Sequence, residues 1–198
     1  MSNTITSIAL TTRYLVDDLS TNAVDIFTYT TTPIFTLTES NPISITDVLV
    51  NGHSSGVTYT TSTDLTQITI TSHLNSLDIV EIDYTCYKNC STTEIQGYVQ
   101  AALVHVSVNN IKTFVIGSDS NTLYPEPLDE EINLIAMIAS ILINPQNISY
   151  RMPDIAVTVP KELPTIDKIR KIIHTYKKDG PGVFYLTEDI WTNASYII

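Results

Sequence analysis

Histidine and cysteine carry much of the acid–base, nucleophilic and metal chemistry of proteins, and this 198-residue chain has few of either. His53, His73, His105 and His174 fall in different predicted elements. The chain contains no GxGxxG, GxxxxGK, GxSxG or HExxH, the motifs of nucleotide-binding loops, esterase nucleophiles and zinc proteases. We therefore expect a protein that is not an enzyme, with no catalytic residue and no cofactor.

The two cysteines, Cys86 and Cys90, form a single CxxxC pair. A structural zinc site usually takes four ligands from two close pairs, so we predict no metal site. The first ten residues lack the basic start and the apolar run of a signal peptide. Without a sign of export, one cysteine pair does not indicate a disulfide framework.

Three groups of neighbouring acidic residues could each act as a general acid and base or bind Mg²⁺. The groups are Asp17-Asp18, Glu81 with Asp83, and residues 129–131. Simpler interpretations fit all three. The first is typical of a turn, the second of the solvated face of a strand, and the third of a helix N-terminus, where negative charge is favoured.

Positive charge gathers near the C-terminus, on a predicted helix over residues 166–178. Clustered cations can contact nucleic acid, but neither aromatic residues interleaved with the cations nor an arginine-rich groove accompanies them. A solvated face, or a contact with an acidic partner or a neighbouring copy, fits better. The apolar end of the chain is a second candidate, because it could pair with the edge of a partner's sheet. The candidate interaction residues are Lys168, Arg170, Lys171, Lys177, Lys178, Tyr196, Ile197 and Ile198.

Residues 1–90 are rich in Thr, Val, Ile and Tyr and predict a small β-sandwich-like module. Asn51-Gly52 indicates a hairpin turn, since both residues tolerate positive φ. Further along the chain, Val80, Ile82 and Tyr84 alternate with the acidic residues Glu81 and Asp83, as in a strand with one buried face. The clearest strands are predicted at 34–38, 45–50, 57–61, 67–71 and 79–84.

Residues 91–198 predict a helical body, which gives an α+β fold overall. Ser91 and Glu94 have the capping-box spacing at the start of a helix over 91–108. Two more helices are predicted, at 128–143 and 166–178. Short strands are predicted at 111–116, 155–159, 183–186 and 195–198.

The predicted helix at 128–143 is apolar on nearly every side. Such a helix must be surrounded, either inside its own subunit or by partner copies, and the sequence leaves both alternatives open. It is shorter than the roughly 20 residues that cross a bilayer, so we expect no membrane association. The net charge of −11 also argues against a protein that coats nucleic acid, because neutralising phosphates requires clustered Lys and Arg.

Several segments together resemble the head-to-tail connector proteins, also called neck or adaptor proteins, of tailed bacteriophages. The segments in residues 91–198 look like the helical body of such adaptors, and they are STTEIQGYVQAALVHVS, INLIAMIASILI, PDIAVTVP and TIDKIRKIIHTYKK. In the first part, DVLVNG, VTYTTSTDLTQITIT and LDIVEIDYTCY are similar to small β modules of many virion proteins.

The resemblance implies a structural role in the neck of the virion, with the protein made in the cytoplasm of a bacterial host. Copies would form a ring, of twelve as in the family, between the portal protein and the tail. DNA would pass through the lumen without sequence-specific binding, and an acidic lumen would repel its phosphates. The basic helix or the C-terminal residues would meet the portal or other neck proteins.

Two other function classes remain open at this stage. One is a different virion component, such as a tail-tube, baseplate or head-decoration protein. The other is a β module that binds a ligand or a cell surface. The single tryptophan, Trp191, lies outside the β-rich part, which argues against an aromatic platform for sugars.

Overall fold

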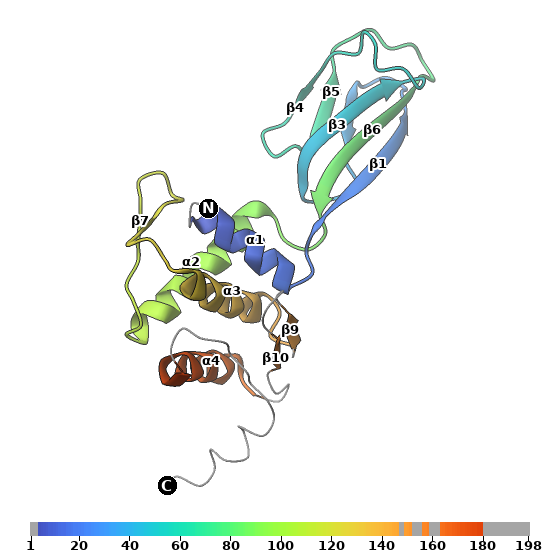
Figure 1. The fold of residues 1–198 in the computed structure, drawn as a ribbon. Helices are drawn as coiled ribbons and strands as arrows, with labels where there is room; N and C mark the ends of the chain where they lie inside the picture. The colour runs from blue at the N-terminus through green and yellow to red at the C-terminus, as the bar shows by residue number, and fades with distance from the viewer. Residues whose placement is uncertain (1–3, 147–148, 152–155, 159–162, 180–198) are drawn as a thin grey trace. The chain divides into compact units, whose positions relative to one another are not determined.

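The computed structural model describes residues 4–146, 149–151, 156–158 and 163–179. The chain divides into two compact units, Asp18–Thr92 and a second unit made of Met1–Asp17 with Thr93–Ile198. The predicted α+β class is confirmed, with antiparallel sheets in the first unit and most of the helical structure in the second. We refer to them as the β unit and the helical unit (Figure 1).

The expected division at residue 90 lies close to the observed end of the β unit, but the first seventeen residues were assigned to the wrong part. They belong to the helical unit, where α1 (Ile5–Leu15) forms a helix. The side chain of Thr4 caps this helix by accepting from the N–H of Ser7 at 3.3 Å. Ile5 and Ile8 are fully buried, and this helical spacing explains why the segment packs with the other helices.

The β unit consists of two three-stranded antiparallel sheets, in the orders β1-β6-β3 and β2-β5-β4. Phe35 and Ile68 from one sheet and Val48 and Ile82 from the other share one core cluster, as expected for a sandwich. The strands are β1 (Ser20–Thr28), β2 (Ile34–Thr36), β3 (Pro42–Val50), β4 (Tyr59–Thr61), β5 (Gln67–Ile70) and β6 (Ile79–Tyr87).

The five predicted strands are confirmed as β2 to β6, with differences at their ends, and β1 was missed. The predicted alternation along β6 is also present, since Val80, Ile82 and Tyr84 are buried and the acidic residues between them are not. Asn51 and Gly52 adopt φ angles of 52° and 79°, the positive values that the turn after β3 requires.

The described part of the helical unit contains four helices, one more than predicted, because α1 joins α2 (Thr92–Val108), α3 (Asp129–Ile143) and α4 (Thr165–Asp179). Short strands pair between them: β7 (Val115–Ile116) with β8 (Leu123–Tyr124), and β9 (Ser149–Arg151) with β10 (Ala156–Thr158). The strands predicted at 183–186 and 195–198 lie outside the described residues.

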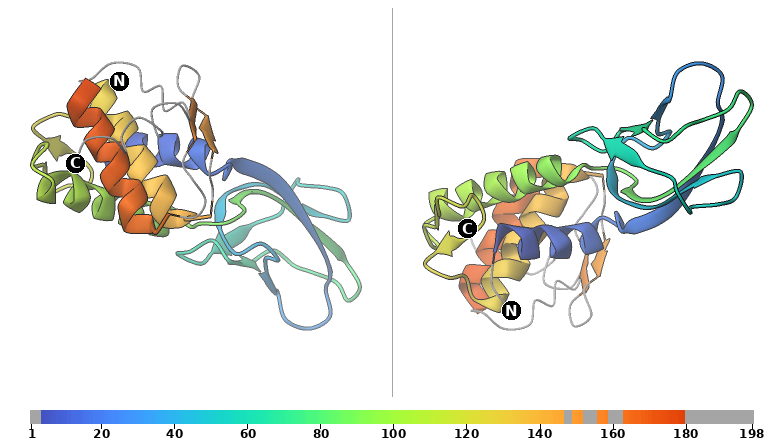
Figure 2. Two further views of the ribbon diagram at one scale, coloured as in Figure 1. Left: turned by 90° about the horizontal axis from the view of Figure 1, so that it is seen from below. Right: turned by 90° about the horizontal axis from the view of Figure 1, so that it is seen from above.

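Helix α3 lies inside the helical unit and packs against α1 and α4 (Figures 1 and 2). Every residue from Leu134 to Ile141 is buried, and none is more than 1% exposed. The sequence left open whether the subunit or partner copies surround this helix. The structure shows that the subunit itself surrounds it. No helix in the described ranges is both long and apolar enough to cross a membrane.

We predict that Ala139→Asp unfolds the helical unit of an isolated subunit. Ala139 is fully buried, so the new carboxylate would lack both water and a partner, at a cost of about 3 kcal/mol or more. Urea denaturation followed by circular dichroism measures the effect. Ala101→Asp, at an exposed position of α2, is the matched control and should cost no more than about 1 kcal/mol. Equal stability of the two variants would contradict burial within the subunit.

Candidate functional site

The five cations predicted as an interaction surface on α4 do not form one open surface. Lys168 is the clearest departure, since it is only 1% exposed. Its Nζ donates to the carbonyl oxygen of Pro145 at 2.6 Å, just beyond the end of α3. A lysine can be buried in this way when its ammonium group finds an acceptor and its stem packs on apolar neighbours. Lys168 therefore connects α4 to the end of α3, and its prediction as a surface residue is wrong.

The other described cations of α4 are in varied surroundings. Lys177 donates from Nζ to the carbonyl oxygen of Asn109, directly after α2, and so connects α4 to that helix. Arg170 is exposed and pairs with Asp167 one turn away at 3.4 Å, a contact that contributes little in water. Partial burial lowers the pKa of Lys171. Arg170 and Lys171 remain candidates for contact with a partner.

The remaining predicted interaction residues are Lys178, Tyr196, Ile197 and Ile198. The side chain of Lys178 lies outside the described residues, although its backbone belongs to α4. Tyr196, Ile197 and Ile198 also lie outside the described ranges.

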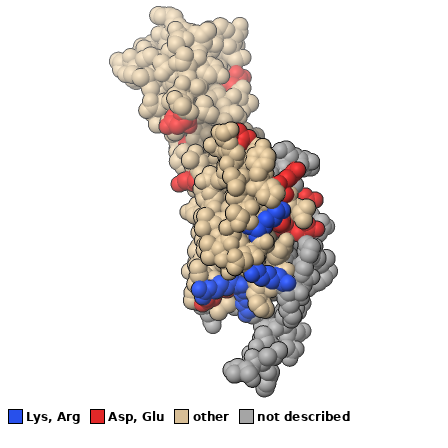
Figure 3. Space-filling model, turned by 90° about the vertical axis from the view of Figure 1, so that its left-hand side faces the viewer, with Lys and Arg blue, Asp and Glu red and all other residues tan. Residues whose placement is uncertain are grey.

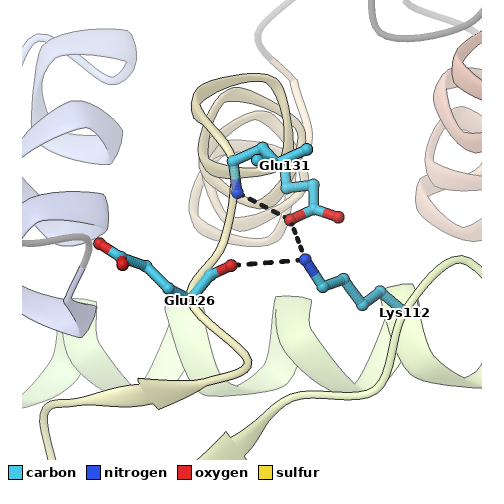
Figure 4. Close-up of polar contacts among 4 residues, drawn as sticks. Lys112, Glu126 and Glu131 are labelled. Atoms are coloured by element: carbon cyan, nitrogen blue, oxygen red, sulfur yellow. Dashed lines mark hydrogen bonds and ion pairs between the residues drawn. The ribbon is translucent and has the colours of Figure 1, made fainter.

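A second ionic contact fixes the start of α3 (Figure 4). The Nζ of Lys112 lies 2.7 Å from Oε2 of Glu131 and donates to the carbonyl oxygen of Glu126 at 3.4 Å. The same Glu131 oxygen accepts from the N–H of Leu128 at 2.8 Å, which satisfies one of the unpaired donors at the helix start. The Glu131 side chain is 8% exposed, so this contact is well shielded from water.

The acidic start of α3 also affects a residue on α4. Burial raises the pKa of Tyr176, and the negative charges of Glu131 and Glu130 raise it further. The acidic group at 129–131 therefore does more than favour the helix dipole, because Glu131 takes part in tertiary structure. Sequence patterns alone did not indicate Lys112 as its partner.

In the β unit, one polar network lies at the edge of the core. Tyr84 is 1% exposed, and its hydroxyl donates to Oδ2 of Asp25 at 3.0 Å. The N–H of Thr38 donates to the same oxygen at 2.7 Å, and the N–H of Glu39 donates to the tyrosine hydroxyl at 3.2 Å. Burial raises the pKa of Tyr84 to about 12. The network fastens the connection after β2 to β1 and β6.

The structure also places the other two acidic groups named from the sequence, Asp17-Asp18 and Glu81 with Asp83. Asp17 adopts a positive φ of 56°, consistent with the predicted turn. Asp18 is fully buried, and its carboxylate accepts from the N–H groups of Asn89 and Cys90 at 2.9 and 3.2 Å. It thereby holds together the two ends of the β unit. Glu81 and Asp83 lie on the outer face of the sheet, as predicted.

The loop between β7 and β8 caps helix α1, a contact that sequence reasoning missed. Oδ1 of Asn121 accepts from the N–H and the hydroxyl of Thr6, both at 2.9 Å, and the carbonyl of Asn121 accepts from the N–H of Ile5. Hydrogen bonds from the hydroxyl and the N–H of Thr122 and from the N–H of Asn121 lower the pKa of Asp119 to about 2. Asp119 thus holds the loop that caps the helix.

Histidines and cysteines do not gather into a reactive centre in the part of the chain that the structure describes. Both cysteines are free thiols there, and Cys86 is buried with its Sγ near Thr21. No group of three or more His, Cys, Asp or Glu that could hold a metal ion occurs among these residues.

The feature that most resembles an interaction site is the outer side of α2. This helix of 17 residues contains one acidic residue and neither Lys nor Arg. On the side opposite its buried residues, Val104 and Val108 are 60% and 73% exposed. Figure 3 looks onto the side where β7 and the end of α2 lie, and a broad part of the helical unit seen there has no charged side chain.

The chain matches no model of a known protein family, and no curated protein matches it.

We predict that Lys168→Ala destabilises the protein by about 1–3 kcal/mol, because it removes a charged hydrogen bond and the packing of the lysine stem. Arg170→Ala, two residues further along the same helix, is the matched control. Its side chain is 69% exposed, so the change in free energy of unfolding should stay within about 0.5 kcal/mol. Urea denaturation measures both. Equally small effects would contradict the structural role of Lys168.

The depressed pKa of Asp119 predicts a dependence on acid. A carboxyl group with a lowered pKa in the folded state stabilises the protein above its unfolded pKa, and this stabilisation is lost as pH falls. The loss should therefore occur between the ordinary value of 3.8 and about 2. Carbon-detected NMR titration of the Asp119 carboxyl group measures it, with a peptide of residues 115–126 as control. If the Asp119 carboxyl group titrated near 3.8 in both the protein and the peptide, Asp119 would not hold the loop that caps α1.

Proposed function

We propose that the protein is a structural component of the head-to-tail connector of a tailed bacteriophage. In this proposal, copies form a ring, of twelve as in the connectors that the sequence resembles, between the portal protein and the tail. DNA passes through the lumen without sequence-specific contacts. The function is geometric, and no residue acts as a catalyst.

The observation that carries this proposal is the outer side of α2, which has no acidic residue and neither Lys nor Arg after Glu94 in the first turn. Surface helices of monomeric proteins normally present charged residues to water, whereas this helix exposes Tyr98, Val104 and Val108. The subunit does not need these side chains for its own core, because Ile95, Val99 and Val106 on the opposite side are buried there. A neighbouring copy in a ring would remove the exposed apolar side chains from water.

The burial of α3 changes which helix would form the contact between copies. Since residues 134–141 of α3 are enclosed by their own subunit, this stretch offers no surface to a neighbour. A subunit that folds first and assembles afterwards suits a ring of identical copies joined by a repeated heterologous contact. The outer side of α2 is the surface proposed for that contact.

Charge supports the proposed passage of DNA. The sequence carries 21 acidic and 10 basic residues, and one of the basic ones, Lys168, is buried in the helical unit. A lumen lined by such a protein would repel phosphates and limit adhesion during ejection. The exposed Arg170 is proposed to meet the portal or a neighbouring neck protein, in the neck of the virion.

We predict that purified protein forms rings, alone or with portal protein, and that Val108→Glu prevents this. Val108 is 73% exposed, so the substitution should change the free energy of unfolding by less than about 1 kcal/mol while placing a charge in the contact. Native mass spectrometry and negative-stain electron microscopy report the assembly. His174→Glu adds the same group at an exposed position of α4 and serves as control.

Two results would refute the proposed function. One is a wild-type protein that stays monomeric and joins neither portal nor tail. The other is mapping of the chain to a different part of purified particles, such as the tail tube or the head surface. Rings that form equally well with Val108→Glu would retain the function but reject α2 as the contact.

A further inference from the structure

The two edges of the sheet β1-β6-β3 differ. Strand β3 begins with Pro42 and pairs with β6 through two register shifts, between Pro42 and Ser44 and between Ile45 and Asp47. Bulges and proline are common means of protecting a sheet edge from further pairing. Strand β1 has neither, since its nine residues pair with β6 in unbroken register and include no proline or lysine. The edge of β1 is therefore regular and carries no bulge, proline or lysine, and its one charged residue, Asp25, has its carboxylate bonded to Tyr84 and Thr38.

The direction of the backbone groups along β1 follows from the hydrogen bonds at its end. The N–H of Tyr29 donates to the carbonyl of Asp78, on the β6 side. In a regular antiparallel ladder, alternate residues point both backbone groups toward the same neighbour. Residues 21, 23, 25 and 27 therefore face β6, and the backbone groups of Asn22, Val24 and Ile26 point away from it. The N–H of Asn51 donates to the carbonyl of Ile79 on the far side of β6, as this alternation requires.

The residues with outward-pointing backbone groups also carry exposed apolar side chains. Val24 is 53% exposed and Ile26 is 66% exposed, on the outer face of the sheet. On the core side of the same strand, Phe27 packs against the core but is only partly buried. An added strand would pair the free backbone groups and cover both sets of side chains.

The surroundings of this edge are acidic. Asp83 lies directly across from Val24, and Asp47 lies across from Asp83 on the next strand, with Glu81 across from Ile26. One carboxylate oxygen of Asp83 is buried without a hydrogen-bond partner among the residues that the structure describes. Two carboxylates opposite each other are unfavourable unless a cation offsets them. A Lys or Arg side chain reaching across the outer face would supply that charge.

Charge argues against a second copy of this chain as the partner that pairs with the edge of β1. From Asp18 to Thr92 the sequence has eight acidic residues and one basic residue, Lys88. Edge-to-edge pairing of two such units would bring like charges together, which disfavours association. A strand of opposite charge would be attracted instead.

We propose that the open edge of β1 binds an extended segment of a different protein, in which β-branched residues alternate with Lys or Arg. The segment adds a strand to the sheet, makes backbone hydrogen bonds with residues 22–28, and places its cations over Asp83 and Glu81. This interaction is independent of the contact between copies through α2, so either can fail without the other.

The test uses the full-length protein and a fluorescent peptide, Thr-Lys-Val-Lys-Ile-Lys-Val-Lys-Thr, followed by fluorescence anisotropy. Val24→Pro is the main variant. The N–H of residue 24 points to the open edge, so proline there removes no bond to β6. The variant should stay folded and bind the peptide at least tenfold more weakly. Val24→Thr keeps the N–H and the β propensity and is the matched control, with binding within about threefold of wild type.

Two control peptides separate the sources of affinity. Replacing each Lys of the peptide by Glu should abolish binding if the acidic face recognises cations. In an antiparallel added strand, the Lys residues opposite Asn22, Val24 and Ile26 point their backbone N–H groups toward β1. Backbone N-methylation of these Lys residues removes the donors without changing charge, and should also abolish binding. This second control keeps the test decisive even if Val24→Pro does not fold.

The opposite results would overturn the inference. Equal binding of the Lys and Glu peptides would reject charge recognition, and undiminished binding by the N-methylated peptide would reject strand addition. Failure of the Lys peptide to bind, together with a dimer in analytical ultracentrifugation that Val24→Pro removes, would show that a second copy occupies the edge.

Discussion

The burial of helix α3 is the constraint on which the helical unit depends. Eight consecutive residues, 134–141, are removed from water, so other elements must cover the helix on all sides. One of these elements, α1, comes from the start of the chain, while α4 follows α3 in sequence. The β unit is therefore an insertion between α1 and α2. Asp18 closes it by holding the returning chain at Asn89 and Cys90.

Polar contacts hold the ends of the helices around this apolar centre. Lys112 and Glu131 fix the start of α3, Lys168 reaches the chain just after its end, and Lys177 connects α4 to the end of α2. Lysine suits this role because its long stem packs on apolar surface while its head finds a carbonyl or carboxylate. Lys168 is buried in this contact, whereas Lys177 remains exposed while it makes its hydrogen bond. After Glu94 in its first turn, α2 carries no acidic residue and neither Lys nor Arg on its exposed side.

Sequence patterns predicted much of the fold but little of the arrangement of its charges. Periodicity is a local property, and it located α2, α3, α4 and five strands. It missed β1, whose Asn22 and Asp25 interrupt the usual strand composition, and it also missed α1. The residues of α1 are predicted in the β-rich part because packing partners distant in sequence leave no local pattern. The basic residues of α4 were predicted on the surface, since nothing in the sequence shows that Pro145 and Asn109 present acceptors to Lys168 and Lys177. The uncharged side of α2 is visible in the sequence, but its exposure is known only from the structure.

Hydrogen exchange of the isolated subunit at low concentration tests the central claim most directly, because it reports protection of α3 in the absence of neighbours. If the subunit alone encloses this helix, the amides of residues 134–141 exchange more slowly than those of any other helix, and they exchange only through global unfolding. Rapid exchange of α3 in the dilute subunit, with protection appearing only on assembly, would contradict the account.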